Sequence, residues 1–118
     1  KTRYAANQKR TRLRQARDTL EQIKDAVRLE VMTTYLNLQA AEKNIWVAKK
    51  SVESAKENFR ISKERYQEQV ATATEVLDAQ TRLTQAKTNH TNSLVEFNVA
   101  RARLIRAMGL EDEPALDE

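Results

Sequence analysis

Two long heptad stripes, separated by one short break, constrain the fold of this chain more than any other feature. In each stripe, apolar or small side chains recur at alternating steps of three and four residues, the spacing of a helix face that packs on another helix. The first stripe comprises Thr34, Leu38, Ala41, Ile45, Ala48, Val52, Ala55, Phe59, Ser62 and Tyr66. The second comprises Val76, Ala79, Leu83, Ala86, His90, Ser93, Phe97, Ala100, Leu104 and Ala107. The pattern predicts two helices packed side by side.

Folding the chain near Ala71 brings the two stripes into register. Large side chains then oppose large ones, as with Phe59 and Leu83, and small ones oppose small ones, as with Ala55 and Ala86. Such layers favour an antiparallel hairpin whose backbones approach the short end of the usual spacing of about 8–10 Å. The sequence therefore predicts an all-α fold, a long antiparallel coiled-coil hairpin.

The composition agrees with long helices. One Gly and one Pro in 118 residues leave little room for strands and tight turns, and 32% charged residues with 5% aromatics are typical of coiled coils. No apolar run approaches the roughly 20 residues of a membrane helix. Gly109 is expected to cap the second helix, with Pro114 beyond it. We expect a hairpin domain over residues 1–110, with helices at about 2–68 and 73–108 and a tip at about 69–72, followed by an acidic tail at 111–118.

The first stripe continues upstream of the region that the second helix can reach. This extension comprises Leu13, Ala16, Leu20, Ile23, Val27 and Val31. The step from Val27 through Val31 to Thr34 is a stutter, which locally unwinds a coiled coil. A second set of apolar residues lies beside the first stripe: Leu29, Met32, Leu36, Ala40 and Val47 on the first helix, and Val95, Val99, Ala102 and Ile105 on the second. These surfaces predict helical neighbours, either other copies or another part of the same polypeptide.

The net charge of +4 is unevenly distributed. Seven cations precede the first acid, Asp18: Lys1, Arg3, Lys9, Arg10, Arg12, Arg14 and Arg17. A basic end of this kind occurs in proteins that bind nucleic acid or anionic lipid, and equally on a solvated helix face. Because acids are interspersed with the cations beyond Asp18, we expect no nucleic-acid partner.

The sequence shows no arrangement of residues that is typical of a catalytic site. There is no Cys, and the single His90 falls on the second stripe, where it is expected to pack, so no metal site is predicted. Glu75 and Asp78 lie one helical step apart, but we expect no pocket within one hairpin to make them an acid–base pair. The sequence predicts neither an enzyme nor a cofactor.

The break between the stripes resembles the hairpin tip of the TolC-like outer membrane efflux protein family. The resemblance rests on Arg65-Tyr66, Val70-Ala71-Thr72, Glu75–Gln80 and the closing Ala100–Gly109, supported upstream by Val31–Leu38 and Ala55–Asn58. It covers essentially residues 10–109. The order and spacing of these segments are more specific than any one of them alone.

This resemblance implies a function in transport. It implies a homotrimer in which such hairpins form a periplasmic α-barrel beneath an outer-membrane β-barrel, so that this chain would be a fragment lacking the membrane strands. It implies export of small molecules or proteins with a periplasmic adaptor protein and an inner-membrane transporter. The entrance constriction would contain Tyr66, Glu75 and Asp78, and the adaptor would dock on Gln69, Val70, Ala71 and Thr72.

The tip departs from the family pattern at two positions. Gln69 stands where the family usually has Gly, at a turn position that can require a positive φ. Ala71 stands where some members have a basic residue that pairs with the acids, which puts that contact in doubt here. A different reading of the same pattern is a coiled-coil interaction arm, such as the hairpin of a periplasmic adaptor itself.

Overall fold

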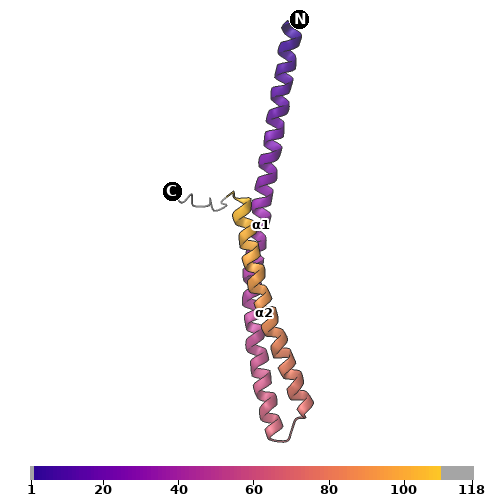
Figure 1. The fold of residues 1–118 in the computed structure, drawn as a ribbon, viewed down its shortest axis with the longest axis vertical. Coiled ribbons are helices and arrows are strands. Elements are labelled where there is room, and N and C mark those ends of the chain that lie inside the picture. Colours follow the sequence, from indigo (N-terminus) through magenta and orange to yellow (C-terminus); the bar gives the residue numbers. More distant parts are fainter. Residues whose placement is uncertain (1, 110–118) are drawn as a thin grey trace, which may run out of the picture.

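The computed structural model describes residues 2–109, and it shows two antiparallel helices (Figure 1). Helix α1 comprises Thr2–Gln67 and α2 comprises Ala73–Ala107. The molecule is 100 Å long, and α2 runs back along only the half of α1 that is nearer the turn (Figure 1). The described residues contain no strand, which confirms the predicted all-α hairpin. Pro114 and the acidic tail expected at 111–118 lie outside the described residues.

One seam holds the two helices together. Every predicted stripe position from Thr34 to Ser62 on α1, and from Val76 to Ala107 on α2, is buried or half-buried. The most completely covered side chains are Ala41, Ala79, Ser93 and Leu104, with 7–9% of their surface exposed. The only other described residues that are partly covered are Val31, Ala71 and Ile105. The heptad spacing therefore identified the interface between the helices almost residue by residue.

The predicted stripe is wrong at its last α1 position, Tyr66. Its side chain is 51% exposed, whereas Ser62, one turn earlier, is half-buried. The helices diverge as they approach the turn (Figure 1), and α1 ends one residue after Tyr66. The heptad continues to this point, but the Tyr66 side chain is not buried there.

The first half of α1 extends alone beyond the end of α2 (Figure 1). Every residue from Thr2 to Glu30 is exposed, including Leu13, Leu20 and Ile23 at 52–58%. The second apolar set is uncovered as well, with Leu29, Met32 and Leu36 more than half exposed and only Ile105 half-buried. The described chain therefore supplies no cover for either surface.

Charged side chains on the outer face of α1 pair within the helix. Arg60 donates hydrogen bonds to Glu57 at 2.5 and 3.1 Å and to Glu64 at 2.8 Å, and Lys50 lies 3.4 Å from Glu53. The hydrogen bond from Arg60 holds the pKa of Glu57 below its ordinary value. These pairs are exposed, so they support the helix only modestly.

Candidate functional site: the turn and the groove beside it

The C-terminal end of α1 forms a Schellman motif, in which two backbone hydrogen bonds close the last turn. The Val70 N–H donates to the Arg65 carbonyl at 2.8 Å, and the Gln69 N–H donates to the Tyr66 carbonyl at 3.0 Å. The Ala71 N–H also donates to the Arg65 carbonyl, at 3.2 Å. This motif satisfies carbonyls at the helix end that would otherwise have no partner.

Gln69 adopts the left-handed conformation that the motif requires, with φ of +62°. Glycine is the usual residue there because a Cβ costs about 1–2 kcal/mol in this conformation. The turn is therefore retained without the glycine, and Gln69 stores backbone strain at this position. Gly109 ends α2 in the same way, with φ of +72° and its N–H donating to the Arg106 carbonyl, which confirms its predicted role as a cap.

Thr72 begins α2 as its N-cap. Its backbone is extended, and its hydroxyl accepts a hydrogen bond from the Glu75 N–H at 3.3 Å. Glu75 also lies in the first turn of α2, where a negative charge is stabilised by the helix dipole. Thr72 is thus needed locally to start the helix, independently of any role in binding.

The four tip residues are not equally accessible. Val70 is 64% exposed, and Gln69 and Thr72 are exposed as well, whereas Ala71 is half-buried. Val70 therefore offers the main apolar contact of the turn. Ala71 is covered instead, and its N–H donates to the Arg65 carbonyl.

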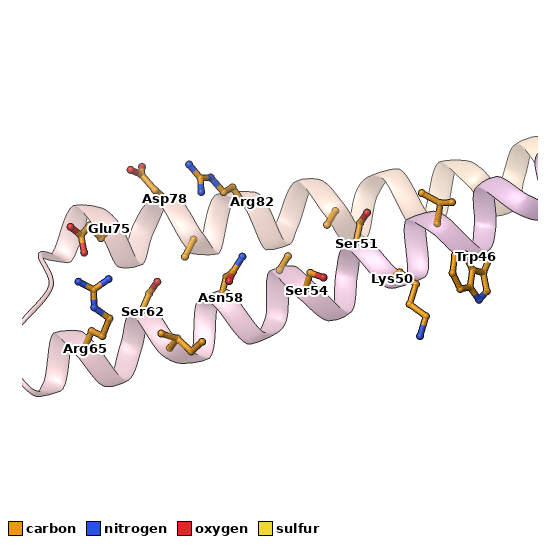
Figure 2. A pocket seen from close by; sticks show the side chains of 15 residues that line it. Trp46, Lys50, Ser51, Ser54, Asn58, Ser62, Arg65, Glu75, Asp78 and Arg82 are labelled. Carbon is orange, nitrogen blue, oxygen red and sulfur yellow. The ribbon is translucent and has the colours of Figure 1, made fainter.

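A groove opens between α1 and α2 just behind the turn, with a volume of about 860 Å³. Figure 2 shows polar and small side chains of both helices around it. The α1 side includes Ser51, Ser54, Asn58, Ser62 and Arg65; the α2 side includes Glu75, Asp78, Ala79, Arg82 and Ala86. Glu75 and Asp78 thus line an open groove, in which both acids remain exposed.

The small seam layers explain the groove. Ala55 and Ala86, which form one predicted small layer, line the groove together with Ser62 and Ala79. Where the helices diverge, side chains of this size do not fill the space between them. Small side chains thus leave room for a groove beside the seam, although Ala79 itself is only 8% exposed.

Opposite charges gather at the turn end of the groove. Arg65 from α1 points toward Glu75 of α2, and Asp78 and Arg82 extend from α2 nearby (Figure 2). No ion pair within 4.0 Å joins these four side chains in the part of the chain that the structure describes. They are therefore available to other charged groups. At the far end of the groove, the Lys50 ammonium lies 5.7 Å from the centre of the Trp46 ring.

The structure brings together two of the three predicted constriction residues. Glu75 and Asp78 line the groove, whereas Tyr66 does not. The sequence interpretation missed Arg65 and Arg82 as members of this charged cluster. The signal for Arg82 was its position four residues after Asp78, the spacing at which side chains meet on one helix face.

Other kinds of site find no support in the described residues. They include no group of acidic or His side chains able to hold a metal ion, and His90 is half-buried on the seam. Neither helix within residues 2–109 is apolar over a length that could cross a membrane.

The chain was compared with known proteins. The model of a protein family described as "Outer membrane efflux protein" matches residues 1–110. No curated protein and no solved structure matches the chain. Proteins of the matching family are transport channels of the outer membrane rather than enzymes. The match covers the whole of both helices and the turn between them, and the chain therefore belongs to the outer membrane efflux protein family.

Proposed function

We propose that this hairpin forms part of the wall of a periplasmic tunnel through which an efflux system exports small molecules or proteins. The observation that carries this proposal is the single seam between α1 and α2, which leaves the turn at the free end of a rod 100 Å long. In a chain of the efflux family, a rod of that length is suited to span a compartment rather than to enclose a core. Its free end is suited to contact other components.

We propose further that three copies of the protein associate, with their hairpins side by side in an α-barrel. The exposed apolar set beside the seam supports lateral contacts of this kind. Leu36 and Val95 are each more than half exposed, although they lie on the two helices that the seam already joins. A helix with apolar side chains on a second face is suited to a second helical neighbour.

The turn is proposed to dock a periplasmic adaptor protein, which connects the tunnel to an inner-membrane transporter. Val70 is the strongest candidate contact, because its apolar side chain is 64% exposed at the very end of the hairpin. Gln69 and Thr72 flank it and are exposed, and Ala71 supports the turn from within. The preformed hydrogen bonds of the turn lower the entropic cost of binding.

The acids behind the turn are proposed to line the entrance together with Tyr66. Glu75 and Asp78 extend from the first turns of α2, and a ring of such carboxylates would favour cations over anions. Arg65 and Arg82 lie in the same groove, so they would moderate that preference in the state described here.

Adaptor docking is tested by substitutions at the turn that spare the helices. Val70→Ser should weaken binding of the purified adaptor to the outer-membrane protein that contains this hairpin. Val47→Ser removes an apolar side chain of similar exposure far from the turn. If Val70→Ser and Val47→Ser change the affinity equally, the turn is not the docking site.

The entrance assignment is tested by ion selectivity of the same protein in a planar bilayer. Glu75→Gln with Asp78→Asn should reduce the preference for cations, measured as a shift of the reversal potential in a salt gradient. Glu53→Gln on the outer face of α1 should leave the potential nearly unchanged. An unchanged potential in the double variant would remove these two carboxylates from the entrance.

A further inference from the structure

The two edges of the seam on α1 differ in charge. Between Leu38 and Ser62, the residue directly before each large seam side chain is uncharged, whereas the residue directly after each small one is charged. The first set, which we call the uncharged flank, comprises Asn37, Asn44, Ser51 and Asn58. The second set, which we call the charged flank, comprises Glu42, Lys49, Lys56 and Lys63.

The two flanks lie on opposite sides of the hairpin. In a heptad, the residue before one seam position and the residue after the other border the seam on opposite edges. Ser51 and Asn58 of the uncharged flank line the groove behind the turn (Figure 2), and no residue of the charged flank is among its lining. All eight residues are exposed. The hairpin therefore has a groove side with an uncharged α1 edge and an opposite side with a charged one.

The groove side of α2 is charged near the turn and uncharged behind it. Glu75 and Arg82 lie seven residues apart and both line the groove, and Asn89 is the next residue in this series. The Gln85 side-chain amide donates a hydrogen bond to the Asn89 side-chain carbonyl at 3.0 Å. The next charge in the series, Glu96, follows seven residues later. Behind the charged cluster at the turn, the flanking residues of both helices on this side are thus uncharged as far as Glu96.

The difference in charge indicates which side of a tunnel wall faces the passage. Glu75 and Asp78, which we propose to line the entrance, lie on the side of the uncharged flank. If the other side faced inward, the lysines of the charged flank would be brought together around one ring by every copy of the hairpin. Like charges repel most where they are close together and little water or salt separates them. Facing outward, the same lysines are farther apart and remain hydrated.

We propose that the uncharged flank lines the passage behind the acidic entrance, so that cargo is selected by charge at the entrance alone. This inference rests on the proposed tunnel and adds the surface that cargo meets inside it. Conduction requires sites that hold a passing molecule weakly enough to release it. Amide and hydroxyl groups exchange hydrogen bonds with water and cargo, but they carry no net charge that would retain an anion or a cation. Cargo of either sign therefore passes this stretch without being held.

The test compares two positions that differ in the side they occupy. Ser51 and Lys49 are two residues apart on α1, both are exposed, and they belong to opposite flanks. Ser51→Cys and Lys49→Cys are introduced singly into the outer-membrane protein that contains this hairpin, in a background with no other accessible Cys. Each variant is placed in a planar bilayer with a salt gradient. The reversal potential is measured before and after a negatively or a positively charged methanethiosulfonate reagent is added.

The expected result is a response on the groove side only. The negative reagent should shift the reversal potential of Ser51→Cys toward a greater preference for cations, and the positive reagent should shift it the other way. Neither reagent should shift the potential of Lys49→Cys. Asn58→Asp and Lys56→Gln each lower the charge by one unit on opposite flanks, and only Asn58→Asp should increase the preference for cations.

Several results would overturn the proposal. Equal shifts at positions 49 and 51 would show that the two flanks are not distinguished, and a shift at position 49 alone would place the charged flank in the passage. A Ser51→Cys thiol that reacts in the unfolded protein but not in the assembled one would identify the uncharged flank as a contact between hairpins. If Glu75→Gln with Asp78→Asn shifts the potential and Ser51→Cys does not, the entrance assignment stands and this inference fails. A protein that conducts no ions would instead refute the tunnel itself.

Discussion

The two halves of α1 use the same heptad repeat but differ in what covers it. From Val31 to Ser62, every stripe position is at least half-buried against α2. From Leu13 to Val27, the same spacing continues with larger aliphatic side chains, yet all of them are exposed. Heptad spacing therefore identifies a face that will pack, but it does not identify the partner.

The two halves of α1 also differ in how their exposed charges pair. In the covered half, Lys50 and Arg60 pair with acids three or four residues away on the same helix. In the uncovered half, Arg28 lies 3.8 Å from Asp25, whereas Arg17 and Lys24 have no acid within 4.0 Å among the described residues.

The largest expected effect is a crosslink across the covered half. Ala55→Cys with Ala86→Cys should form a disulfide within one chain, because both residues line the same groove and belong to one predicted layer. In the chain-entropy view, the closed loop would stabilise the hairpin by about 3–4 kcal/mol. Mass spectrometry and non-reducing electrophoresis would detect it. Ala16→Cys with Ala86→Cys should not crosslink within the chain. If the first pair fails while circular dichroism shows intact helices, the register is wrong.

The second largest difference is expected when a buried and an exposed stripe side chain are each shortened to alanine. Leu104→Ala removes a side chain that is 9% exposed, and it should lower the free energy of unfolding by about 2–3 kcal/mol. Leu13→Ala, at a site that is 58% exposed, should change it by less than about 0.5 kcal/mol. Urea unfolding followed by circular dichroism measures both. A similar loss of unfolding free energy in the two variants would show that the N-terminal half of α1 is covered in solution.

A smaller effect is expected at the turn that closes the covered half. Gln69→Gly removes the strain of a positive φ but increases the freedom of the unfolded chain, so the net gain should be about 0.5–1 kcal/mol. The urea concentration at the midpoint of unfolding should rise, while the dependence of the unfolding free energy on urea concentration stays constant. Glu68→Gly, at the preceding exposed residue, should not stabilise. A fall in the midpoint for Gln69→Gly would mean that the glutamine side chain contributes to the turn.

The smallest effect concerns pH. The pKa of Glu57 is lowered by its hydrogen bond with Arg60. The stabilisation from this ion pair is therefore fully present above the ordinary pKa of 4.5. It is lost as the pH falls through the lowered pKa of the folded state. The stability difference between the wild type and Glu57→Gln should therefore shrink below pH 4.5 and also in high salt. Thermal melts by circular dichroism would measure it. Arg17→Gln, which removes no ion pair, should show no such change over that range.

The sequence predicted the helices and the seam well because few other structures were open to it. The only Gly and Pro lie near the C-terminus, so the interruption of the two stripes located the break near residues 69–72, and the Ala and Leu layers determined which faces meet. The left-handed turn at position 69 was also foreseeable from the family pattern. The groove was not, because Ser62 and Ala79 have the same small size whether two backbones converge or diverge. Only the path of the helices decides between these outcomes, and heptad spacing does not encode it.

The hydrogen bonding at the tip has a mechanical consequence. The end of α1 is closed by two hydrogen bonds to the Arg65 carbonyl, and Thr72 separately fixes the first turn of α2. These bonds resist unwinding of the two helix ends. A change in the angle between the helices would therefore be concentrated in the backbone between Ala71 and Thr72.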